Sequence, residues 1–136
     1  GMTESERERF DAILERVVHG LPVHVHDLIE RVPLVVEDRP SAELWASLIE
    51  EGLDLGDDPT ELCGLYTGAA ITERSLEDPA DAPPHVLLFR EGVRAAAGGW
   101  GVPDGDIAEE VLITILHEYG HDQGLDEDDL ADLGYD

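Results

Sequence analysis

A chain of 136 residues is long enough to bury a hydrophobic core and too short for two ordinary domains, so we expect a single domain spanning residues 1–136. Eight arginines and no lysine stand against 33 acidic residues, and the resulting net charge of −25 excludes nucleic acids as partners and favours cations and basic peptides or proteins. No aliphatic run is long enough to cross a bilayer, and the single cysteine, Cys63, allows no internal disulfide. Both facts favour a cytoplasmic protein over a membrane or secreted one.

Helices alternate with a few short strands along the sequence, a pattern typical of the α/β and α+β classes. Apolar residues recur with helical spacing over residues 10–18, and Ser41 is suited to cap a later helix. Pro33, near the start of the first strand, indicates a first or edge position in a sheet, and Gly64 in the second strand indicates a close approach of another backbone. The predicted elements are helices at 4–18, 26–31, 42–51 and 106–123, strands at 32–36, 62–67 and 85–89, and a glycine-rich connection at 98–105.

The sequence His117-Glu118-Tyr119-Gly120-His121 lies within the long predicted helix. Because residues four apart share one face of a helix and lie about 6 Å apart along its axis, the imidazoles of His117 and His121 can converge on one zinc ion. Glu118 is rotated by about 100° from His117, so its carboxylate can reach a water on the zinc without ligating the metal. Two metal ligands and a general base in one stretch of helix are typical of a hydrolytic zinc site.

A third zinc ligand is expected shortly after this helix. Gly124 is suited to a left-handed helix end, which turns the chain so that Glu127 can swing back toward the metal. Two imidazoles and one carboxylate leave the fourth position of the ion for water. The neighbouring Asp126 and Asp128 are alternatives for this ligand.

Three further segments accompany the zinc motif: Val35-Val36-Glu37-Asp38-Arg39-Pro40, Leu62-Cys63-Gly64-Leu65-Tyr66 and Leu133-Gly134-Tyr135. With them, most of the chain resembles the small bacterial zincin-like metallopeptidases with a matrix-metalloprotease-like domain. The family pattern, His-Glu-x-x-His-x-x-Gly-x-x-Asp, maps the metal ligands to His117 and His121 and the base to Glu118, and Glu127 stands where the family has Asp. The resemblance implies an α+β, minimal zincin-like fold, in which a small twisted mixed sheet is backed by helices and one helix carries the active site.

These residues predict a zinc-dependent metallopeptidase that hydrolyses peptide bonds with Glu118 as the general base. Tyr135, eight residues after Glu127, is a candidate to support the metal site or to hydrogen-bond an oxyanion. Larger zincins bind extended peptides along a sheet edge, and the strand at 85–89 is a candidate for that edge. The alternative function is a catalytically silent zincin-fold protein that binds a metal or a partner, which a short chain with little material for substrate subsites favours.

Other residues with metal-binding or nucleophilic potential are expected to be structural. His24 and His26 would form a metal-binding pair only within a strand, whereas a helix is predicted from His26 onward. His85 begins a strand after two prolines, and Cys63 lies on a mostly apolar strand. The two tryptophans are expected to line the core or a pocket, since no cofactor motif surrounds either of them.

Overall fold

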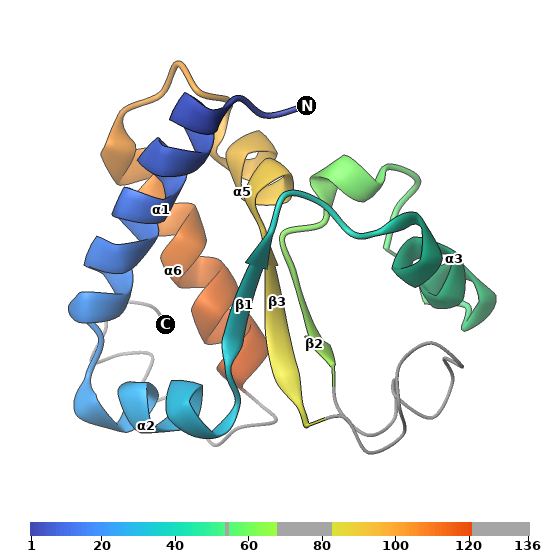
Figure 1. Cartoon of the computed structure of the whole chain (residues 1–136), viewed down its shortest axis with the longest axis horizontal. Helices are drawn as coiled ribbons and strands as arrows, with labels where there is room; N and C mark the ends of the chain where they lie inside the picture. Colours follow the sequence, from blue (N-terminus) through green and yellow to red (C-terminus); the bar gives the residue numbers. More distant parts are fainter. Residues whose placement is uncertain (54, 68–82, 121–136) are drawn as a thin grey trace.

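The computed structural model describes residues 1–53, 55–67 and 83–120. In chain order the elements are α1 (Glu4–His19), α2 (Val23–Arg31), β1 (Leu34–Glu37), α3 (Ala42–Glu50), the 3-10 helix η1 (Pro59–Glu61), β2 (Gly64–Thr67), β3 (His85–Phe89), α5 (Arg90–Ala97) and α6 (Asp104–Gly120) (Figure 1). Helices packed around a small mixed sheet confirm the predicted α+β class. Among the described residues, no helix combines the length and the apolar character that crossing a bilayer requires.

The described strands form one sheet in the order β1-β3-β2. β1 pairs with β3 in parallel, with Leu34 opposite Val86, and β2 pairs with β3 in antiparallel, with Gly64 opposite Leu88. Of the two positions that Pro33 indicated, first or edge, the described sheet agrees with both: Pro33 directly precedes β1, and β1 is an outer strand of that sheet. The strand at 85–89, a candidate for the substrate-binding edge, is central instead, because β3 pairs with β1 and β2 and its apolar side chains are buried on both faces.

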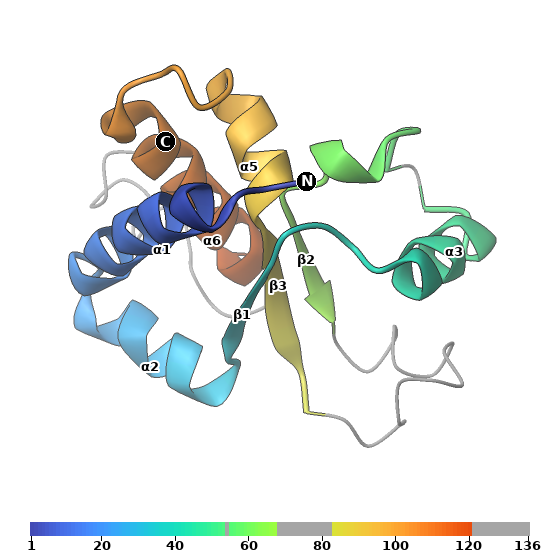
Figure 2. The same ribbon diagram turned by 45° about the horizontal axis from the view of Figure 1, so that its top comes forward.

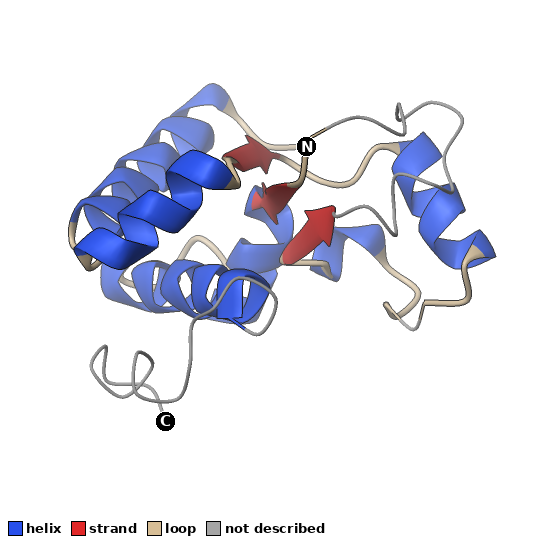
Figure 3. Ribbon diagram, turned by 90° about the horizontal axis from the view of Figure 1, so that it is seen from below, coloured by secondary structure: helices blue, strands red, loops and turns tan. Residues whose placement is uncertain are grey.

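Alternate residues of β3 divide the core into two layers. Val86 and Leu88 pack with the buried faces of α1, α2, α5 and α6, whereas Leu87 and Phe89 pack with Leu48 of α3 on the other face. In Figure 3, α3 lies on the opposite side of the strands from α1 and α6. α1 lies against α6 (Figure 2), so the first helix of the chain supports the helix that carries the zinc motif.

Helix α5 was absent from the predicted elements. It follows β3 with no intervening loop, and its N-cap, Phe89, makes no side-chain capping bond, so the sequence carries no start signal. Gly92, in the middle of α5, also disfavours a helix because glycine has a low helix propensity. The structure explains this glycine, because a Cβ at Gly92 would lie 1.9 Å from the carbonyl oxygen of Leu62. The absent side chain lets α5 pack directly on the backbone that leads into β2.

The glycine-rich connection between α5 and α6 is held by Arg9 of α1. The guanidinium of Arg9 donates to the carbonyl oxygens of Trp100, at 2.7 Å, and Val102, at 2.8 Å. Arg9 and Arg94 also lie over the indole of Trp100, 5.7 and 6.0 Å from the ring centroid. The start of α6 is thereby fixed to the N-terminal helix.

Candidate metal centre

Helix α6 turns one face to the core and the opposite face to solvent. Ile107, Val111, Ile115 and Tyr119, spaced by four residues, are all fully buried. His117 is exposed on the other side of the helix. An imidazole in that position can reach a metal ion without breaking any core contact, so the described part of the motif fits a zinc ligand.

Tyr119 fixes the rotation of the helical turn that carries the motif. Its ring is fully buried, and its hydroxyl donates a hydrogen bond of 2.6 Å to the carbonyl oxygen of Val32, just before β1. Burial also raises the pKa of the Tyr119 phenol well above its usual range. Sequence analysis assigned this residue no role, although its spacing from Ile115 signals a core position.

Glu118 lies between the core and the solvent, against the edge strand β2. Its side chain is half-buried, and its Cγ would be 3.2 Å from a Cβ built at Gly64. The same Cβ would be 2.7 Å from Cγ2 of Thr114, one turn earlier on α6. Gly64 therefore does lie at a close contact, but the groups from the zinc-motif helix that approach it are side chains and not the backbone that was predicted.

Cys63 lies beside this contact but is not suited to nucleophilic chemistry. Its thiol is partly buried at the entry to β2, and burial, with the carboxylates of Glu110 and Glu118 nearby, raises its pKa. A thiol with a raised pKa carries little thiolate at neutral pH. The side chain packs against the main hydrophobic core, as expected for a structural cysteine.

The other histidines singled out in the sequence are His24 and His26 on α2 and His85 at the start of β3. His24 and His26 lie on α2, where residues two apart point in different directions, so the helix does not support a His-x-His metal pair. The Nδ1 atom of His85 is 2.9 Å from the Thr67 hydroxyl and 3.1 Å from the carbonyl oxygen of Pro83. These contacts join the adjacent ends of β2 and β3, in agreement with a structural role.

The remaining predicted site residues lie outside the described part of the chain: His121, Asp126, Glu127, Asp128 and Tyr135. Within residues 1–53, 55–67 and 83–120, no three metal-ligating side chains converge. This part of the chain contains only one of the three predicted ligands, His117. The complete ligand set therefore stays a prediction.

Comparison with known proteins identifies the class to which this fold and this helix belong. The family model described as zincin-like metallopeptidase matches residues 29–135, a range that includes the sheet and the entire zinc motif. The chain belongs to the zincin-like metallopeptidase family. No curated protein matches the sequence. Family membership implies zinc binding in general, and the exposed imidazole of His117 beside Glu118 agrees with it.

Proposed function

We propose that the protein is a zinc-dependent peptidase, in which His117, His121 and Glu127 hold the metal. Bound zinc supplies a Lewis acid that polarises the scissile carbonyl and lowers the pKa of a water molecule. Glu118 accepts the proton of the attacking water and passes it to the leaving amine. Asp126 or Asp128 takes the place of Glu127 if the turn after the helix brings one of them closer to the metal.

The placement of Glu118 is the observation that carries this proposal. A general base must lie beside the metal and beside the substrate at the same time. Glu118 follows the exposed His117 directly, and its Cγ lies close to Gly64 of β2, so the side chain that the motif assigns as the base is half-buried beside the sheet. A glutamate serving only as an acidic surface residue would need no such contact.

The outer edge of β2, as the described residues form it, is suited to bind an extended peptide. The hydrogen bond from Phe89 N to Cys63 O, 2.8 Å long, sets the register of the antiparallel ladder. Because bonding alternates along such a ladder, Leu65 bonds to β3 while Gly64 and Tyr66 direct their N–H and C=O groups away from it. In the described part of the chain the sheet has no strand beyond β2. We infer that the substrate pairs with this edge, in place of the edge predicted at 85–89.

The net charge of the protein suggests a preference for basic substrates. With a net charge of −25, the protein attracts peptides and proteins that carry basic residues.

Tyr135 is a candidate to hydrogen-bond the oxyanion that forms at the scissile carbonyl. Replacing Tyr135 with Phe should lower turnover without changing zinc content if the phenol has that role.

A peptide-library digest of the native protein and of Glu118→Ala, each after measurement of its zinc content, tests the proposal. We expect about one zinc per chain in both proteins and cleavage by the native protein only, since Glu118 acts on the water and not on the metal. Glu109→Ala, at an exposed position of the same helix, is the matched control and should cleave normally. Tight zinc binding with no cleavage of any peptide would instead support the catalytically silent alternative.

A further inference from the structure

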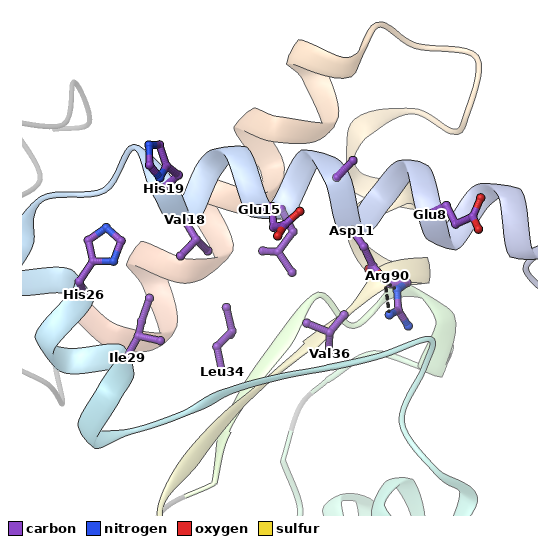
Figure 4. Close-up of a pocket in the computed structure, with 12 residues that line it drawn as sticks. Glu8, Asp11, Glu15, Val18, His19, His26, Ile29, Leu34, Val36 and Arg90 are labelled. Atoms are coloured by element: carbon purple, nitrogen blue, oxygen red, sulfur yellow. Dashed lines mark hydrogen bonds and ion pairs between the residues drawn. The ribbon is translucent and has the colours of Figure 1, made fainter.

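An apolar groove lies between α1 and the edge strand β1, on the opposite edge of the sheet from β2 (Figure 4). Its volume is about 770 Å³, and its lining comes from four separate elements, α1, α2, β1 and α5. Its apolar lining consists mainly of Leu14 and Val18 of α1, Ile29 of α2, and Leu34 and Val36 of β1. These aliphatic side chains are only partly buried, which means that the described fold does not cover them.

Ion pairs hold the groove open at one end. Arg90 bridges its two walls, with Nε 3.0 Å from Oδ1 of Asp11 on α1 and Nη1 3.0 Å from Oδ1 of Asp38 just after β1. Arg7 of α1 reaches the other oxygen of Asp38, at 2.7 Å. Because these bonds fix the distance between α1 and β1, a ligand entering the groove meets walls that are already in place.

The rim of the groove is acidic along α1. Glu8, Asp11 and Glu15 follow one another at spacings of three and four residues, so they lie in a row on the groove side of the helix. Arg90 is the one arginine in the lining, and it is engaged by Asp11 and Asp38. Glu8 and Glu15 are exposed, and among the described residues neither has an ion-pair partner. Their charge is available to a cationic ligand.

We propose that this groove binds a cationic, amphipathic segment of a partner protein. Apolar side chains of the segment fill the aliphatic lining, while its lysines or arginines meet Glu8 and Glu15 at the rim. A neutral apolar segment would leave these carboxylates without charged partners, and an acidic segment would be repelled. The proposal concerns the β1 edge of the sheet and does not depend on peptidase activity.

The test measures binding of a fluorescently labelled short peptide that alternates lysine with valine, by fluorescence anisotropy in low-salt buffer. We expect saturable binding that is lost when glutamate replaces the lysines and when serine replaces the valines. Glu8→Lys with Glu15→Lys should weaken binding about tenfold, since two exposed attractions become repulsions. The control variant carries Glu50→Lys and Glu61→Lys, which change the net charge equally at exposed sites on α3 and η1, and it should bind almost normally.

A second pair of variants tests the location directly. Ala12 is exposed at the mouth of the groove, so Ala12→Trp should block it without disturbing the core and reduce binding at least tenfold. Ala46→Trp, at an exposed position of α3, is the matched control and should leave binding intact. Equal weakening by both charge variants, or full binding by Ala12→Trp, would overturn the proposal. So would a dimer in sedimentation analysis that Ala12→Trp dissociates, because a second copy would then occupy the groove.

Discussion

At the scale of single residues, Gly64 connects the sheet to the zinc-motif helix. Alanine at this position would bring its Cβ within 2.7 Å of Thr114 Cγ2 and 3.2 Å of Glu118 Cγ. We expect Gly64→Ala to lower the free energy of unfolding by about 1–3 kcal/mol, as overpacked cores do. It should also lower peptidase activity, because the displaced helix turn carries Glu118, the proposed general base. Chemical denaturation and a peptide-cleavage assay measure the two effects.

A second substitution tests whether the methyl group of Thr114 causes the loss of stability in Gly64→Ala. Thr114→Ser removes the methyl group that the new Cβ meets and keeps the hydroxyl that donates to the carbonyl oxygen of Glu110, at 2.8 Å. The double variant Gly64→Ala with Thr114→Ser should therefore recover most of the lost stability. If its destabilisation equals the sum of the two single effects, the Thr114 methyl is not the obstacle.

The site residues that could be predicted from the sequence depend on local patterns, whereas the role of Tyr119 depends on a contact between distant parts of the chain. His117 and Glu118 were recognised because their chemistry depends on spacing within one helical turn. Gly64 was recognised because a glycine inside a strand already indicates a close approach. Tyr119 was missed, since its hydroxyl bonds to Val32, 87 residues away, and no local pattern encodes that distance.

At the scale of elements, the proposed pairing of the substrate with the outer edge of β2 in the described sheet can be tested. Tyr66→Pro removes the N–H group that the ladder register directs away from β3, and proline is tolerated on an edge strand. We expect KM for peptide substrates to rise about tenfold, because one backbone hydrogen bond to the substrate is lost. The midpoint of thermal unfolding should fall only about as much as in Tyr66→Ala, since both variants lose the ring that packs on the core and the pairing with β3 does not use this N–H group.

Tyr66→Ala is the control for loss of the aromatic side chain. It keeps the backbone N–H, so it should affect KM less than Tyr66→Pro does. A proline variant that folds normally and cleaves peptides with an unchanged KM would show that the substrate does not pair with β2. The motif on α6 would then act on peptides bound elsewhere.

Elements with strong local signals were predicted, and an element defined by its neighbours was not. The helical spacing before Gly20 and the capping position of Ser41 predicted α1 and α3, and Ser41 indeed accepts from the amide of Leu44 at 3.1 Å. Helix α5 depends on its packing against Leu62, which only the folded chain brings close. The strand order has the same origin, because the central position of β3 follows from partners on both sides and not from its own sequence.

At the scale of the whole molecule, few arginines link distant segments of a strongly acidic chain. Arg7 and Arg90 join α1 to the end of β1 and the start of α5, and Arg39 donates two hydrogen bonds, of 2.6 and 2.7 Å, to the buried carboxylate of Glu91. Arg9 joins α1 to Asp104 at the start of α6. In a chain with a net charge of −25, these four of the eight arginines therefore lie where separate segments meet.

Asp38 is the carboxylate that Arg7 and Arg90 share, so its removal tests this arrangement. Hydrogen bonds from Arg7, and then from Arg90, hold the pKa of Asp38 below its usual range. A lowered pKa in the folded state means that the stabilisation is complete above about pH 5 and is lost as the pH falls toward the folded-state pKa. We expect Asp38→Asn to lower the free energy of unfolding by about 1–2 kcal/mol at pH 7.

The pH dependence separates this ion pair from a simple loss of packing. The stability difference between the native protein and Asp38→Asn should shrink steadily between pH 5 and pH 2, because protonation of Asp38 then does to the native protein what the substitution does at any pH. Urea denaturation at a series of pH values measures that difference. Asp57→Asn, at an exposed loop position, is the control and should change stability little throughout. A difference for Asp38→Asn that stays constant down to pH 2 would mean that its charge does not join α1 to the sheet.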